Sequence, residues 1–327
     1  SNVVATQEIH REYGGVVPEL ASRAHQQNIV PVVHQALRRA NIDKNQLSAI
    51  AFTRGPGLMG SLLVGTSFAK SLAMGLNIPL IEVNHMQAHI LAHFIKAEEQ
   101  TTPRFPFLAM TISGGHTQIV KVTGYFDMEV IGETLDDAVG EAFDKTAKLL
   151  GIEFPGGPKI EEWAKKGDEN YFKLPKPILK RGGCNMSFAG LKTAILKISK
   201  ELKNEKEKYH LAASFQKTIN EILYEKTKVA MDQFAKNKKN NQKILVIAGG
   251  VAANLTIRKN LTKLAKEKKF LPIFPPKNLC SDNAAMIAWA GIERFKINLT
   301  NNLKFPSKAR WPLDLDAPFL KGPGIKL

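Results

Sequence analysis

Two short apolar runs in the first third of the chain flank a stretch with helical spacing. The runs are SAIAFTRGPG at 48–57 and NIPLIEVNH at 77–85, and each is strand-sized and rich in β-branched or aromatic residues. Between them, GSLLVGTSFAKSLAMGL at 60–76 places apolar residues three and four apart, as an amphipathic helix does. The order of strand, helix and strand predicts a βαβ unit with two parallel strands.

The remainder of the chain alternates in the same way. RFPFLAMTISGGHTQIVKVTG, at 104–124, predicts two strands around a Gly-Gly turn, and TLDDAVGEAFDKTAKLLG, at 134–151, predicts an amphipathic helix that ends at Gly151. SFQKTINEILYEKTKVAMDQF, at 214–234, predicts a further helix, and KILVIAGGVAANLTIRKNL, at 243–261, a buried strand that meets a glycine pair and opens a helix. A strand followed by a glycine turn therefore occurs once in each half, which suggests a nucleotide held between two halves.

Length and composition indicate a globular protein of about two domains, since 327 residues with 44% hydrophobic content can form real cores. The net charge of +16 favours a polyanionic partner such as nucleic acid, although a solvated lysine-rich surface explains the same number. Cys184 and Cys280 form no disulfide scaffold or zinc-finger spacing, which fits a reducing compartment. No apolar run approaches the ~20 residues that cross a bilayer. The sequence opens SNVVATQ, without an initiator Met, and we interpret this start as a fragment or a processed end.

Three histidines stand four residues apart in VNHMQAHILAHF: His85, His89 and His93. On a helix they project from nearly the same side. A zincin protease needs a glutamate directly after the first histidine, but Met86 occupies that position, so this route to water activation is absent. An i, i+4 pair can still chelate a metal, with a carboxylate from elsewhere completing a two-His, one-carboxylate set. From spacing alone, core or surface histidines remain the alternative.

The two glycine turns are candidates for phosphate binding. Glycine lets the backbone approach a ligand closely, so that successive N–H groups can converge on an anion. Ser113, Gly114 and Gly115 form one candidate, and Gly249 and Gly250 with Asn254 form the other. Each turn taken singly is more simply a tight connection.

A series of motifs then occurs in a fixed order: HREYGGVVPELASRAH, NHMQAH, TISGGHTQIV, GETLDDAVGEAFDKTAKLLG, FPGGPKI, SFAGLKTA, AGGVAANLTIR and CSDNAAMIAWAG. In these residues the chain closely resembles the tRNA N6-adenosine threonylcarbamoyltransferases (TsaD), a family formerly called O-sialoglycoprotein endopeptidases. The resemblance covers nearly the whole chain.

The resemblance implies the site residues one by one. His85, His89 and Asp282 match the metal ligands of the family, which implies one divalent ion, Fe²⁺ or Zn²⁺, and leaves His93 as a structural residue or one that supports the ligands. No catalytic side chain is predicted apart from this metal centre. The residues that match the substrate-binding positions, along the acyl-phosphate and around the adenosine, are Thr111, Ile112, Ser113, Gly114, Gly115, Asp144, Gly157, Glu161 and Asn254.

The implied fold is the α/β fold of actin, sugar kinases and Hsp70, with two α/β domains and a nucleotide cleft. We expect residues 1–105 with 286–327 to form the first domain and 106–285 the second. The implied reaction moves the threonylcarbamoyl group from threonylcarbamoyl-adenylate to N6 of the adenosine just 3′ of the anticodon (position 37) in tRNAs reading ANN codons, and releases AMP. The resemblance also implies a cytoplasmic enzyme with a homologous, TsaB-like dimer partner and a small, TsaE-like ATPase.

One departure keeps a second hypothesis open. Family members begin with a strand and a phosphate-facing turn, reading roughly Glu-Thr-Ser-Cys-Asp-Glu-Thr, ahead of the point where this sequence starts. Without that segment we expect a pocket lacking one wall, and the alternative is a non-catalytic scaffold subunit that binds nucleotide or tRNA. A metalloprotease is contradicted by Met86, and a small-molecule kinase of the same fold would not need the His-x-x-x-His pair.

Overall fold

A computed structural model describes residues 1–5, 13–95, 101–236 and 243–317 of the chain. The first residues of the HREYGG motif, 10–12, lie outside these ranges. Backbone contacts divide the chain into two compact units: unit 1 is Ser1–Thr102 with Ser281–Leu313, and unit 2 is Pro103–Cys280 with Asp314–Leu327. The expected domains, 1–105 with 286–327 and 106–285, stay a prediction.

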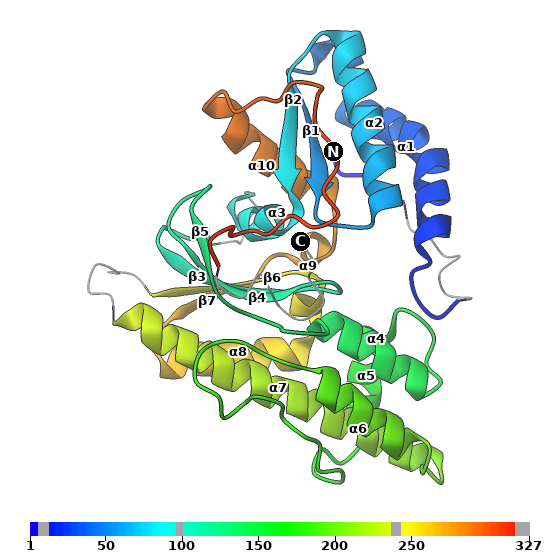
Figure 1. Cartoon of the computed structure of the whole chain (residues 1–327), viewed down its shortest axis with the longest axis vertical. Helices are drawn as coiled ribbons and strands as arrows, with labels where there is room; N and C mark the ends of the chain where they lie inside the picture. Colours follow the sequence, from blue (N-terminus) through cyan, green and yellow to red (C-terminus); the bar gives the residue numbers. More distant parts are fainter. Residues whose placement is uncertain (6–12, 96–100, 237–242, 318–327) are drawn as a thin grey trace. The chain divides into compact units, whose positions relative to one another are not determined.

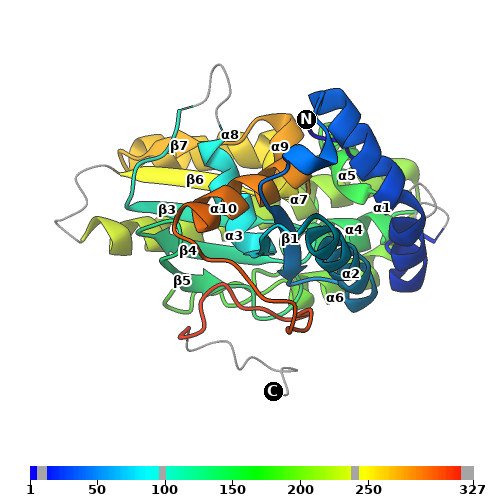
Figure 2. The same cartoon turned by 90° about the horizontal axis from the view of Figure 1, so that it is seen from above.

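Unit 1 is built on the predicted βαβ unit. Its strands β1 and β2 pair in parallel, from Ile50 opposite Leu80 onward, and helix α2 connects them. Figures 1 and 2 show α2 on one side of these strands, with α1 beyond it, and α10 on the other side. The elements of unit 1 are α1 (Pro18–Ala40), η2 (Lys44–Gln46), β1 (Ile50–Gly55), α2 (Met59–Leu76), β2 (Leu80–Asn84), α3 (His85–Leu91), η3 (Ala92–Phe94) and α10 (Ala284–Lys296).

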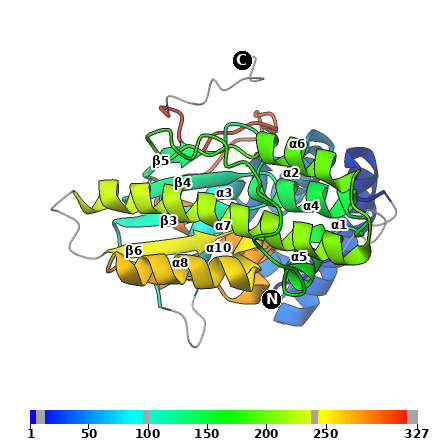
Figure 3. The ribbon, with the colours of Figure 1, turned by 90° about the horizontal axis from the view of Figure 1, so that it is seen from below.

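Unit 2 is a mixed sheet in the strand order β5-β4-β3-β6-β7. The predicted Gly-Gly hairpin is confirmed, since β3 and β4 are antiparallel neighbours; β6 then pairs with β3 in parallel. Figure 3 shows α7 and α8 lying across this sheet. The elements are β3 (Phe107–Ile112), β4 (Thr117–Val122), β5 (Met128–Glu133), α4 (Val139–Leu149), α5 (Gly156–Ala164), α6 (Ala189–Ser199), α7 (Glu205–Ala235), β6 (Ile244–Ala248), η4 (Gly250–Ala253), α8 (Leu255–Glu267), β7 (Leu271–Ile273) and α9 (Lys277–Cys280).

The two units have separate cores. In unit 1, Phe52, Ala69, Ala73 and Leu80 cluster, and the Phe305 ring stacks on Phe52 with 5.7 Å between centroids. In unit 2 a larger core joins the sheet to α4 and α7, with β3 and β6 buried along their whole length. Continuous apolar runs without alternation are what strands covered on both faces require. Among the helices described, none is long and apolar enough to span a membrane.

The placement of the glycine turns corrects one expectation. The pattern of strands and turns alone suggests one turn in each of two halves, but both turns belong to unit 2, and their strands are direct neighbours, with Thr111 opposite Ala248. Parallel neighbours need a long crossover, and here the helices α4 to α7 supply it, which separates adjacent strands widely in sequence. The two turns therefore meet at one edge of one sheet, where the carboxyl ends of parallel strands commonly bind ligands.

Candidate functional site

The histidine pair lies at the start of a short helix in unit 1. Strand β2 ends at Asn84, whose side-chain oxygen accepts hydrogen bonds from the backbone N–H groups of Met86 (2.9 Å) and Gln87 (3.3 Å). This is an N-cap, and it fixes where helix α3 begins. His85 is thus the first helical residue and His89 follows one turn later, with 4.6 Å between their ring centroids.

Asp282 joins this pair from the other end of the sequence. It directly precedes Asn283, which caps α10 by accepting a hydrogen bond from the backbone N–H of Met286 at 3.0 Å. Helices α10 and α3 are in contact, so the two capped ends bring three ligand atoms within 4.8 Å of one another. The sequence predicted these three side chains, Asp282 through the family resemblance, but not the two asparagine caps, although an Asn before a predicted helix is an ordinary cap signal.

The separations within this cluster fit a metal ion. The Nε2 atoms of His85 and His89 lie 3.3 and 3.2 Å from Oδ1 of Asp282. Ligands about 2.1 Å from one ion are about 3.0 Å apart at octahedral angles and about 3.4 Å apart at tetrahedral angles. Both His–Asp distances fall between these limits, and all three ligand atoms lie within 4.8 Å of one another, so the cluster suits an ion that draws the two histidines together.

The burial and charge of these side chains also favour a metal ion. His89 is buried, with 1% of its side chain exposed, and neither ring nitrogen has an aligned hydrogen-bond partner among the described residues. Burial lowers the pKa of His89, and the attraction of Asp282 offsets this only in part. Partial desolvation raises the pKa of Asp282, but its contacts with His85 and His89 outweigh this and hold the pKa well below its usual range. A buried imidazole without a well-aligned hydrogen bond is costly, and a metal bond would relieve that cost.

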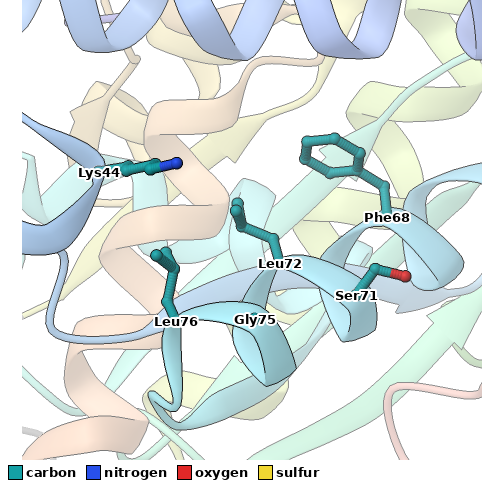
Figure 4. Close-up of a pocket in the computed structure, with 6 residues that line it drawn as sticks. All are labelled: Lys44, Phe68, Ser71, Leu72, Gly75 and Leu76. Atoms are coloured by element: carbon teal, nitrogen blue, oxygen red, sulfur yellow. The ribbon is translucent and has the colours of Figure 1, made fainter.

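His93 behaves as expected for a structural residue. It is fully buried in η3, and its Nδ1 lies 3.1 Å from the carbonyl oxygen of Ile90. Unit 1 also has a shallow hollow along α2, lined by Phe68, Leu72 and Leu76 with Lys44, Ser71 and Gly75 (Figure 4). This hollow contains none of the predicted ligands.

The predicted substrate residues lie in unit 2, where the first glycine turn is fixed by its own hydrogen bonds. The N–H of Ser113 donates to the carbonyl of His116 (2.8 Å), and the N–H of His116 donates to the Ser113 hydroxyl (3.0 Å). The helix α4 then packs on this turn: Gly140 N–H donates to the Ser113 carbonyl (3.1 Å), and a Cβ at Gly140 would lie 2.7 Å from that oxygen. Since the Ser113 N–H is engaged, Gly114 and Gly115 are left to offer N–H groups to an anion.

Three predicted adenosine-lining residues are helix caps in the structure. The Oδ1 of Asp144 on α4 accepts the N–H of Gly156 (2.9 Å), the first residue of α5. From α5, Oε1 of Glu161 accepts the N–H groups of Leu255 (2.8 Å) and Thr256 (3.2 Å), at the start of α8. Glu161 uses Oε1 for both of its contacts and leaves Oε2, so capping and ligand contact are compatible there.

Asn254 is the third of these caps. Its Oδ1 accepts the N–H of Ile257 (2.9 Å) and its Nδ2 donates to Oε1 of Gln216 on α7 (3.0 Å). Gln216, which sequence reasoning missed, also donates a hydrogen bond from its Nε2 to Oγ1 of Thr256 (3.3 Å). Its signal was weak, because a polar residue inside a long amphipathic helix is normally assigned to the solvated face.

The second glycine turn closes a ring of contacts. Gly249 has φ +93°, and a Cβ there would lie 2.5 Å from the carbonyl oxygen of Ile112, so only glycine fits. Contacts therefore run from Ile112 and Ser113 through α4, α5 and α8 and back to Gly249. Thr111 and Ile112 are fully buried in β3, so neither residue offers surface to a ligand in this structure. At Gly157, as at Gly114 and Gly115, a Cβ would meet open space.

Comparison with known proteins decides the family. A family model described as tRNA N6-adenosine threonylcarbamoyltransferase (TsaD) matches residues 1–289. The chain belongs to this family. A protein of that name from Pelagibacter ubique (strain HTCC1062) is 56% identical over 328 residues, which cover 100% of this chain and 91% of the relative. Another, from Christiangramia forsetii, is 62% identical over 302 residues, covering 90% and 86%.

Solved structures confirm the fold. The T. kodakarensis HypF structure has a TM-score of 0.60 at 15% identity over 82% of this chain and 44% of its own. Full-length HypF in its phosphate- and nucleotide-bound form has a TM-score of 0.56 at 15% identity, covering 82% and 41%. The chain spans less than half the length of either. Together with the family, these likenesses confirm the predicted α/β fold of the actin, sugar-kinase and Hsp70 type.

Proposed function

We propose that this chain transfers the threonylcarbamoyl group from threonylcarbamoyl-adenylate to N6 of adenosine 37 in tRNAs reading ANN codons, and releases AMP. The observation that carries the proposal is family membership: the family model matches residues 1–289, and a transferase of that name is 56% identical over 100% of the chain. A family of tRNA-modifying transferases favours catalysis over the scaffold alternative.

The residues support the chemistry in two places. His85, His89 and Asp282 would hold one divalent ion, Fe²⁺ or Zn²⁺, which would supply Lewis-acid polarisation and a fixed point for the acyl group when bound. In unit 2 the N–H groups of Gly114 and Gly115 would donate hydrogen bonds to an anionic oxygen, on a turn that hydrogen bonds of Ser113 and α4 hold in place. N6 forms the new bond to the carbamoyl carbon and loses a proton, while the bond to the phosphate oxygen breaks and AMP leaves with the electron pair.

Asp144, Glu161 and Asn254 would then line the adenosine. The second oxygen of Glu161 is left to accept a ribose hydroxyl, and the caps hold the starts of α5 and α8 in place for the ligand. Rigid placement of this kind lowers the entropy cost of reaching the reactive arrangement.

The partners follow from the same proposal. The net charge of +16 suits binding to the negatively charged phosphates of tRNA. Because such contacts release counterions, we expect the affinity for tRNA to fall as salt is added. A TsaB-like homologue and a TsaE-like ATPase remain predictions, as does a cytoplasmic location. A metalloprotease remains contradicted, because the buried Met86 occupies the position where a zincin protease needs a glutamate base.

Nucleoside mass spectrometry tests the proposal. The chain, its predicted partners, tRNA and threonylcarbamoyl-adenylate formed by a synthase from threonine, bicarbonate and ATP are incubated together, and the tRNA is then digested. Threonylcarbamoyladenosine that depends on the chain is the expected product. Its absence, in an assay where a bacterial relative of the family gives product, would favour the scaffold alternative.

A further inference from the structure

A turn of unit 2 between α5 and α6 is held in an unfavourable backbone conformation. Ile178 has φ +46°, a left-handed conformation that a β-branched residue rarely adopts, and Gly183 has φ +82°. Backbone strain of this kind persists only where surrounding contacts impose it, and it concentrates at functional sites. We call residues 178–183, ILKRGG, the basic turn.

A single buried lysine imposes this conformation. Lys226 on α7 has 1% of its surface exposed, and its Nζ donates to the carbonyl oxygens of Ile178 (3.1 Å), Arg181 (2.9 Å) and Gly183 (3.3 Å). An ammonium has three N–H donors, so every donor is used on this one turn.

The outer side of the basic turn carries charge that the protein does not use. Lys180 and Arg181 are exposed, and within the described ranges neither side chain has an ion-pair or hydrogen-bond partner. A Cβ at Gly182 or Gly183 would meet no atom within 4 Å, so the backbone beside them is open. Three carbonyl oxygens, which would repel an anion, are engaged by the buried ammonium instead.

Other exposed lysines of unit 2 differ from this arrangement. Lys159 and Lys166 pair with Glu162, and Lys176, just before the turn, pairs with Glu221. Lys263 and Lys266 on α8 are exposed without such partners, but they stand on a regular helix with no strained backbone to maintain. Among these lysines of the described part of unit 2, Lys180 is the one that stands beside a second unpaired cation on a turn whose backbone a buried group holds.

We propose that the basic turn is a docking surface for RNA phosphates, with Lys180 and Arg181 as the contacts and Lys226 as the residue that positions them. This inference rests on the proposed function for its choice of RNA as the polyanion. Phosphate contacts made by two cations strengthen binding without reading sequence, and each adds to the salt dependence of affinity.

Binding of unmodified tRNA to the full chain, measured by fluorescence anisotropy over a series of salt concentrations, tests the surface. For the double variant K180A/R181A we expect affinity at low salt to fall about tenfold, and the slope of log affinity against log salt to shrink by about two. The matched control K263A/K266A removes the same charge from exposed positions and is expected to keep the wild-type slope. Equal slopes for both double variants would overturn the proposal.

A third variant tests the positioning role. K226M keeps both contact residues and the volume of the aliphatic stem, yet we expect a reduced slope like that of K180A/R181A, with AMP binding unchanged by calorimetry. A wild-type slope in folded K226M would overturn the role of Lys226; if K226M does not fold, the two double variants still decide the surface. The binding assay involves no transfer, so a chain that binds tRNA through this turn but makes no product would refute the proposed function and leave the surface standing.

Discussion

Glu161 is the predicted ribose ligand whose structural role can be separated most sharply from its ligand role. Its Oε1 accepts two backbone N–H groups at the start of α8, and it reaches them from α5. Replacing Glu161 by Ala leaves the Leu255 and Thr256 N–H groups without that acceptor. It also removes a negative charge from the positive end of the α8 dipole.

The magnitude follows from these two effects. Losing a side-chain cap costs about 1 kcal/mol, and losing a favourable charge at a helix N-terminus costs about 0.3–1 kcal/mol. We therefore expect E161A to lower the free energy of unfolding by about 1–2 kcal/mol, which is a drop of a few degrees in the melting temperature of unit 2. E161Q keeps an oxygen acceptor and loses only the charge, so its loss should be the smaller of the two.

Scanning calorimetry of wild type, E161A, E161Q and a control, E162A, measures these differences. Glu162 is adjacent on α5 but pairs only with Lys159 and Lys166 on the surface, so E162A should melt with the wild type. AMP titration of the same samples reports the ligand role. An E161A protein with unchanged melting but lost AMP binding would refute the cap, and would mean that Glu161 is free to serve the ligand.

Two further predictions concern the same ring. Burial raises the pKa of Asp144 above its ordinary 3.8, against the opposing hydrogen bonds from Gly156 and Gly157, so the wild type loses stability as pH rises from 3.8 through the folded pKa. The amide of D144N does not titrate, so the melting temperature of D144N minus that of wild type should increase from pH 3.5 to pH 7. A difference in melting temperature that stays constant over this range would refute the effect of burial on Asp144. G249A should cost about 1–3 kcal/mol of unfolding free energy by urea denaturation, because φ +93° is strained and its Cβ would strike Ile112. At Gly250 a Cβ meets open space, so G250A should match wild type, and equal losses would show that the contact with β3 is not responsible.

Local patterns predicted the local elements. The βαβ unit of β1, α2 and β2, the β3–β4 hairpin and the end of α4 near Gly151 all follow from periodicity and turn residues a few positions apart. Gly151, at φ +80°, terminates its helix as a glycine in that place should. Such features depend on neighbours in sequence, which is the information that a pattern contains.

Features that depend on long-range contacts could not be predicted this way. Spacing made His85 and His89 a candidate chelating pair, but it could not name the carboxylate, because Asp282 comes from just before α10. The adjacency of the two glycine turns was missed for the same reason. Lys226 is the plainest case: nothing in its helix pattern shows that its ammonium is buried under three carbonyl groups.

Asp282 is the side chain at which the role of the metal cluster in transfer can be tested. Asp282 is close to both histidines, and D282N keeps its size while removing the charge that a divalent ion requires. If the ion is needed for transfer, D282N should fail in chemistry and still bind tRNA, since the proposed RNA contacts lie on another element.

The most direct measurement is single-turnover transfer of radiolabelled threonylcarbamoyl from its adenylate to tRNA, with wild type and D282N compared in the presence of the predicted partners and with bound metal quantified in each sample. We predict label in tRNA with wild type, and in D282N a loss of bound metal and at least a hundredfold slower transfer with unchanged tRNA affinity. Equal transfer by metal-free D282N, or no transfer by metal-loaded wild type, would contradict the account.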